Sequence, residues 1–168
     1  GIMVFGCSLG ATHAANLYFR RPDIFDRLLA LSGIYTASFG FGDYMDGVVY
    51  ENSPVHYLAN MPYDHPYISM YNQKKAVICV GQGAWEVPDE TRRLQNILRD
   101  KGINVWVDYW GSDCNHDWDW WYKQVEYFVH TLFIKQKEGL AHEKLLYLYP
   151  RIFLQIIGIS AVSLKITA

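Results

Sequence analysis

A serine flanked by two glycines lies near the start of the sequence. The pentapeptide Gly6-Cys7-Ser8-Leu9-Gly10 has the form G-x-S-x-G and joins the apolar run 2–5 to a small-residue stretch over 10–20. A strand that turns sharply into a helix at such a pentapeptide presents the serine hydroxyl above the carboxyl end of a sheet. We therefore predict a nucleophilic Ser8, with the Leu9 amide as one hydrogen-bond donor to an oxyanion. The alternative is a tight turn in which Ser8 only caps the helix.

A serine hydroxyl is a weak nucleophile at neutral pH and needs a general base, most often histidine. His116 is the best placed of the six histidines, because it follows a predicted strand over 103–110 and precedes a predicted helix over 117–133. Its loop lies at the carboxyl end of the sheet, on the side where Ser8 is expected. We predict that His116 is the base. The alternative is that it caps the helix.

A carboxylate after the third predicted strand would complete the set, in the chain order serine, acid, histidine. The strand over 76–80 is followed by Glu86, Asp89 and Glu90. Asp89 and Glu90 belong to the first turn of the next predicted helix, where carboxylates favour the positive end of the helix dipole. Glu86 lies in the loop before that turn, so it is the predicted acid, with Asp89 as the second choice. Its role would be to hold the imidazole of His116 in one tautomer.

These three side chains need a frame that brings three loops to one edge of a sheet. Apolar runs predict strands over 2–5, 27–32, 76–80 and 103–110. Patterns typical of helices cover 10–20, 53–60, 89–101 and 117–133. Strands that alternate with helices in this way predict an α/β architecture, a parallel sheet with crossover helices.

Composition limits the size of the domain and the class of partner. The chain has 168 residues, of which 51% are hydrophobic and 19% charged, so we expect one globular domain. Its 15 Lys and Arg against 17 Asp and Glu leave no basic footprint for nucleic acid. Cys7, Cys79 and Cys114 form no C-x-x-C pair, so neither a disulfide framework nor a zinc site is expected. We expect no metal and no cofactor.

The last part of the sequence differs from the rest. We divide the chain into a domain over 1–134 and a tail over 135–168, which is charged at first and strongly apolar from Leu145 onward. The apolar part reaches the length of about 20 residues that a membrane span needs. Pro150 and Arg151 near its start argue against a span. We expect instead a helical tail that docks on the domain or is unrelated to it.

Three segments carry a resemblance to a known family: GCSLGA over 6–11, VGQGAWE over 80–86 and NHDWDWWYKQ over 115–124. Together they resemble the α/β-hydrolase fold and, within it, the esterase family of esterase D-like enzymes, feruloyl esterases and mycolyltransferases. His116, Asp117 and Trp118 match the segment that holds the family's histidine, with Asn115 where glycine is common. Many relatives have aspartate where this chain has Glu86. The resemblance covers residues 1–133.

The resemblance implies a serine carboxylic ester hydrolase that acts on a small-molecule ester through an acyl-serine intermediate. In the family, earlier strands precede the strand that leads into the nucleophilic serine, and one of their loops gives the second oxyanion donor. The chain therefore corresponds to the carboxyl-terminal portion of such a domain. An acyltransferase with the same residues and a non-catalytic interaction module are the alternatives. Trp85, beside the predicted acid, is expected to contact substrate. We expect a cytoplasmic location, and the oligomeric state stays open.

Overall fold

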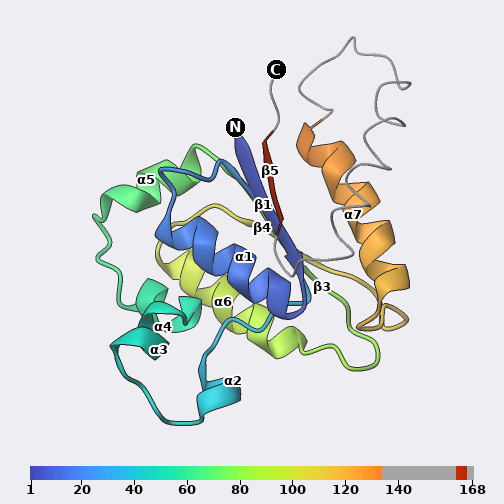
Figure 1. The fold of residues 1–168 in the computed structure, drawn as a ribbon, viewed down its shortest axis with the longest axis horizontal. Helices are drawn as coiled ribbons and strands as arrows, with labels where there is room; N and C mark the ends of the chain where they lie inside the picture. The colour runs from blue at the N-terminus through green and yellow to red at the C-terminus, as the bar shows by residue number, and fades with distance from the viewer. Residues whose placement is uncertain (134–161, 166–168) are drawn as a thin grey trace.

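A five-stranded sheet with the strand order β4-β3-β2-β1-β5 lies at the centre of the fold (Figure 1). The structure is a computed structural model, and it describes residues 1–133 and 162–165. The strands are β1 (Ile2–Cys7), β2 (Arg27–Leu31), β3 (Lys75–Val80), β4 (Trp106–Tyr109) and β5 (Val162–Lys165). β1 to β4 pair in parallel, whereas β5 pairs antiparallel with β1. The predicted α/β fold with a parallel sheet is confirmed.

Helices cover both faces of this sheet. α1 (Leu9–Arg20) and α6 (Pro88–Asp100) lie on one face, and α7 (Trp118–Phe133) lies on the other (Figure 1). Four short helices follow β2: α2 (Ser38–Phe41), α3 (Gly47–Glu51), α4 (Pro54–Ala59) and α5 (Pro66–Asn72). The crossovers bring the carboxyl ends of the parallel strands to the same edge. The loops after β1, β3 and β4, which hold the predicted site residues, therefore open at one edge of the sheet.

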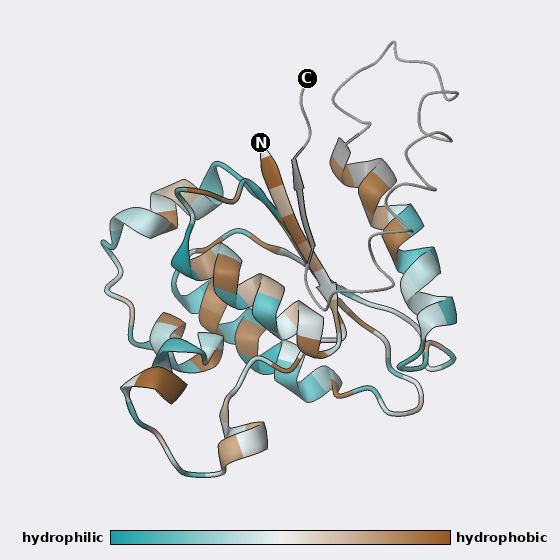
Figure 2. Ribbon diagram, in the orientation of Figure 1, coloured by the Kyte–Doolittle hydropathy of each residue, from teal (hydrophilic) through white to brown (hydrophobic). Residues whose placement is uncertain are grey.

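The two faces of the sheet are buried in separate hydrophobic clusters, because side chains alternate along a strand. On β1, Val4 belongs to the cluster with α1 and α6, while Met3 and Phe5 belong to the cluster with α7. β2 and β3 alternate in the same way. Since both faces are covered, the strand sequences are continuous apolar runs, and Figure 2 shows this hydrophobic character along β1.

The helix boundaries follow signals in the sequence. Small residues let α1 approach the sheet closely, and Ala11, Ala14 and Ala15 are fully buried. α6 begins at Pro88, a residue suited to the first turn because no acceptor for an N–H group exists there. Gly102 just after α6 has a φ of 66°, the left-handed conformation that ends a helix. The short helix predicted over 53–60 is confirmed as α4.

The expected tail, 135–168, is described only at Val162–Lys165. These residues form β5 beside β1, a strand where a helix was expected. The edge of a sheet offers unpaired N–H and C=O groups, and an apolar segment of the same chain can satisfy them by pairing. The other expectations for the tail, a membrane span included, fall on residues 134–161 and 166–168, outside the described residues. Among the residues that are described, no helix combines the length and apolar character needed to cross a membrane.

Candidate active site

Ser8 occupies a strained turn between β1 and α1. Its φ of 54° and ψ of −126° define a conformation that residues with a side chain rarely adopt. Its amide donates to the Leu31 carbonyl oxygen at 2.8 Å, which ties the turn to the end of β2. Gly6 lets the turn close, because a Cβ at this position would overlap the Gly10 carbonyl group. The half-buried Ser8 therefore has a fixed place at the carboxyl end of the sheet.

Three predicted side chains from three different loops form one chain of hydrogen bonds. The Nε2 atom of His116 lies 2.9 Å from Oγ of Ser8, and its Nδ1 atom lies 3.3 Å from Oε2 of Glu86. A carboxylate only accepts, so the Nδ1 atom carries the imidazole proton and Nε2 accepts from the serine hydroxyl. This is the arrangement that a histidine needs in order to take a proton from a serine.

Contacts between two loops hold His116 in place. Its amide donates to the Ala84 carbonyl oxygen at 2.9 Å, and the Ala84 amide donates to Oδ1 of Asn115 at 2.7 Å. The indole ring of Trp121 meets the imidazole edge to face, with 4.9 Å between the ring centroids. The loop after β3 and the loop after β4 therefore act as one unit that sets the imidazole between Ser8 and Glu86.

The Glu86 side chain is buried, and one of its partners, Ser32, was not identified from the sequence. The Glu86 side chain is 1% exposed. Its Oε1 atom accepts from the Ser32 hydroxyl at 2.6 Å and from the Gly81 amide at 3.3 Å. The Ser32 hydroxyl accepts in turn from Nε1 of Trp121 at 3.0 Å. The one signal in the sequence was a Ser-Gly pair at the end of a predicted strand, which is too common to single out.

Backbone strain is concentrated at this edge of the sheet. In residues 1–133 and 162–165, three residues other than glycine have a positive φ: Ser8 at 54°, Ser32 at 55° and Trp85 at 64°. Each such residue costs of the order of 1 kcal/mol and persists only where its surroundings impose it. Ser8 and Ser32 belong to the hydrogen-bonded network, and Trp85 directly precedes Glu86. Strain of this kind gathers at functional sites.

The other predicted residues lie around the network. The Leu9 amide, first in α1, has no acceptor among the described residues, which is the usual state of a helix N-terminus. The side chain of Trp85 is 89% exposed. Asp89 lies in the first turn of α6 and pairs with Arg92 at 2.6 Å rather than with the imidazole. Of the predicted acid and the second choice, the structure thus brings only Glu86 to His116.

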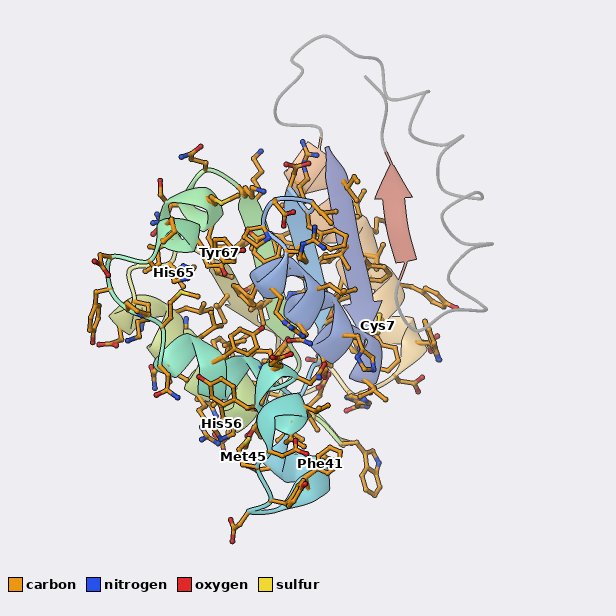
Figure 3. The ribbon with its side chains drawn as sticks, turned by 60° about the vertical axis from the view of Figure 1, so that its left-hand side comes forward. Cys7, Phe41, Met45, His56, His65 and Tyr67 are labelled. Carbon is orange, nitrogen blue, oxygen red and sulfur yellow. The ribbon has the colours of Figure 1, made fainter. Side chains whose placement is uncertain are left out.

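Two other histidines lie away from Ser8, and the thiol beside it is not a reactive nucleophile at neutral pH. Figure 3 shows His56 and His65 well apart from Cys7, the neighbour of Ser8. Burial raises the pKa of the half-buried Cys7 thiol to about 12, so the thiol stays protonated at neutral pH. Within the described part of the chain, no group of His, Cys, Asp and Glu side chains could hold a metal ion.

Several solved structures share this fold. A ferulic acid esterase aligns with a TM-score of 0.60 and 21% identity, over 77% of this chain and 51% of its own. The fluorophosphonate-binding serine hydrolase F of Staphylococcus aureus aligns with a TM-score of 0.60 and 14% identity, over 77% of this chain and 53% of its own. The capsule O-acetyltransferase of Neisseria meningitidis serogroup A aligns with a TM-score of 0.54 and 14% identity, over 76% of this chain and 54% of its own. At these identities the likeness shows the fold alone. The chain spans about half the length of these proteins.

A sequence comparison identifies the family. The search of curated proteins found no match. A family model described as "Putative esterase" matches residues 1–132, a range that runs from β1 through most of α7. It includes Ser8, Glu86 and His116 and all four parallel strands. The chain therefore belongs to the Putative esterase family.

Proposed function

We propose that this chain carries the reacting centre of a serine carboxylic ester hydrolase, which works through an acyl-enzyme formed on Ser8. The observation that carries the proposal is the chain of hydrogen bonds from Ser8 through His116 to Glu86, at 2.9 Å and 3.3 Å. A serine, a histidine and a carboxylate so arranged, with the serine on a strained strand-to-helix turn, are suited to acyl transfer. Membership of the esterase family supports the same reading.

His116 moves the proton in both halves of the reaction. As Oγ of Ser8 bonds to the ester carbonyl carbon, Nε2 of His116 takes the hydroxyl proton and negative charge develops on the carbonyl oxygen. His116 then gives this proton to the leaving alkoxide oxygen, the bond to the alcohol breaks, and the acyl-serine remains. Water next loses a proton to His116 and attacks the acyl carbon. Ser8 leaves with that proton, and the carboxylic acid is released.

The Leu9 amide is the proposed donor to the developing oxyanion. It lies at the N-terminus of α1, where unpaired amides and the helix dipole both favour negative charge. The resemblance implies a second donor from an earlier loop of the domain. One such donor is typically worth about 100- to 1,000-fold in turnover. The Leu9 amide would therefore supply part of the electrostatic stabilisation of the transition state.

We propose that the substrate is a small ester with an apolar or aromatic group. Trp85 directly precedes Glu86 and is 89% exposed, so its indole has no role in the core. Phe39 and Phe41 of α2 and the nearby Tyr44 are also more than half exposed, and Figure 3 shows Phe41 on the outside of the molecule. Pockets for small ligands are lined mainly by such side chains. Trp85 is the residue that we expect to contact the substrate.

An acyltransferase is the second candidate. The same acyl-serine can pass its acyl group to an alcohol instead of to water, with His116 taking the proton from the alcohol. The likeness in fold to the capsule O-acetyltransferase is the observation that favours it. The two candidates share the first half of the reaction and differ only in the acceptor.

Covalent labelling followed by mass spectrometry tests the proposal. A fluorophosphonate probe should add to the chain once, on the peptide that contains Ser8, because the probe reacts with activated serines. Incubation with an aryl ester should then release the acid alone if the chain is a hydrolase, and a new ester when an alcohol is present if it is an acyltransferase. A chain that circular dichroism shows to be folded but that takes up no probe would instead be a non-catalytic interaction module.

The choice of acid gives a prediction of its own. Glu86→Ala should slow labelling of Ser8 by at least about 100-fold, because the imidazole loses the group that holds its tautomer. Asp89→Ala should leave the rate within about twofold, since its exposed pair with Arg92 contributes little. Labelling rates of the two variants at one probe concentration decide the matter. Equal loss in both, or a larger loss in Asp89→Ala, would show that Glu86 is not the acid.

A further inference from the structure

The hydrogen bond between Ser32 and Glu86 is the shortest that this carboxylate makes. The two oxygen atoms are 2.6 Å apart, whereas the Gly81 amide and the Nδ1 atom of His116 each lie 3.3 Å from the carboxylate. Short bonds from a hydroxyl to a charged acceptor are the strong ones. Ser32 is 4% exposed and the Glu86 side chain 1%, so water competes little for either group.

The direction of this hydrogen bond is set by a third residue. Nε1 of Trp121 lies 3.0 Å from the Ser32 hydroxyl, and an indole nitrogen can only donate. Ser32 must therefore accept from Trp121, which leaves its single O–H proton for Oε1 of Glu86. The same indole ring lies against the imidazole of His116, with 4.9 Å between centroids. Trp121 thus contacts both Ser32 and His116, the two side chains that flank the Glu86 carboxylate.

The backbone conformation at Ser32 also fixes the position of its hydroxyl. Its φ of 55° is unfavourable for a residue with a side chain, and its amide donates to the Cys79 carbonyl oxygen at 2.7 Å. Ser32 is thereby fixed to the end of β3, just before the loop that carries Glu86. A strained residue persists only where the surrounding structure over-determines it.

We propose that Ser32 is a positioning residue, which holds Oε1 of Glu86 so that Oε2 faces His116. The inference rests on the proposed function, because it gives the role of Ser32 in the same site. Without the Ser32 hydroxyl, Glu86 would keep only the longer contact with the Gly81 amide on that side. The carboxylate could then turn away, and the imidazolium of His116 would lose its charged partner.

The Nδ1–H proton of His116 reports this alignment directly, because it lies between the imidazole and Oε2 of Glu86. A charged acceptor makes a stronger hydrogen bond than a neutral one, and the proton of a stronger hydrogen bond resonates further downfield. The position of this resonance at one fixed pH therefore shows how well the carboxylate faces the imidazole.

Proton NMR of His116 at one fixed pH provides the test, with a His116→Gln spectrum to assign its resonance. Glu86→Gln should move the Nδ1–H resonance upfield, because a neutral amide is a weaker acceptor than a carboxylate. Ser32→Ala should move it in the same direction, because the carboxylate loses its shortest hydrogen bond and can turn away from the imidazole. Combining Ser32→Ala with Glu86→Gln should add nothing further, since Ser32 acts through Glu86.

Ser53→Ala is the matched control. Ser53 is a fully buried serine whose hydroxyl lies 2.5 Å from Nδ1 of a different histidine, His56. Its removal should leave the His116 Nδ1–H resonance unchanged. A resonance that stays in place or moves downfield in Ser32→Ala, or a shift that persists unchanged in the Glu86→Gln background, overturns the proposal. Because the NMR measurement needs no reaction at Ser8, a chain that fails to label would contradict the proposed function, while the resonance positions would still show whether Ser32 positions Glu86.

Discussion

A Ser8→Ala variant is expected to lose fluorophosphonate labelling and ester cleavage by a factor of at least about 10,000. Alanine removes Oγ, the one atom of the site that bonds to the acyl carbon, and leaves the hydrogen bond between His116 and Glu86 intact. The turn keeps its strain, because alanine at a φ of 54° carries the same steric cost as serine. Stability should therefore stay within about 1 kcal/mol of the parent.

A double variant shows whether Ser8 and His116 act together. Groups that act as a unit give losses that do not add, so His116→Ala combined with Ser8→Ala should be no slower than Ser8→Ala alone. Cys7→Ala is the control for reaction at the neighbouring thiol. The Cys7 thiol, with its pKa raised to about 12, should contribute nothing, and this variant should label at the parental rate. Labelling of the Ser8→Ala variant at the parental rate would show that the reactive group is not Ser8.

The positions of the three predicted site residues could be inferred from sequence because each follows a parallel strand. Ser8, Glu86 and His116 come after β1, β3 and β4, and parallel strands bring their carboxyl ends to a common edge. The expected chain order of serine, acid and histidine further reduced the number of candidate residues. Asp89 was the second choice for the acid, because it was expected to belong to a helix turn, which is where it lies. Fold topology, rather than local pattern, made this part of the site predictable.

Ser32 could not be found in the same way. Its role depends on a distance of 2.6 Å to a residue 54 positions away and on a tryptophan 89 positions away. A serine after a strand is common, and nothing in its neighbours signals a positive φ. The strand β5 was not predicted for a related reason, since pairing at an edge depends on which segment is within reach and not on the segment's own periodicity. Tertiary contacts determine both the role of Ser32 and the pairing of β5.

Gly6→Ala is expected to destabilise the fold strongly. A Cβ at Gly6 would overlap the carbonyl group of Gly10 and crowd the amide of Ala11, and both are backbone atoms that cannot move without shifting α1. α1 is pressed against the sheet through fully buried alanines, so there is no free volume into which it can retreat. We expect a loss of about 3 kcal/mol or more in the free energy of unfolding, measured with urea.

Gly40→Ala is the matched control for this prediction. Gly40 lies in α2, where a Cβ would meet no atom within 4 Å, so alanine should be neutral or stabilise by up to about 1 kcal/mol through its higher helix propensity. The Gly6 variant, where it remains folded, should also label more slowly, because any shift of α1 moves the Leu9 amide and Oγ of Ser8 together. Similar unfolding free energies for the two variants would show that α1 and β1 are less tightly joined at the turn. The strain at Ser8 would then have to be imposed by its hydrogen bond to Leu31 rather than by the close approach at Gly6.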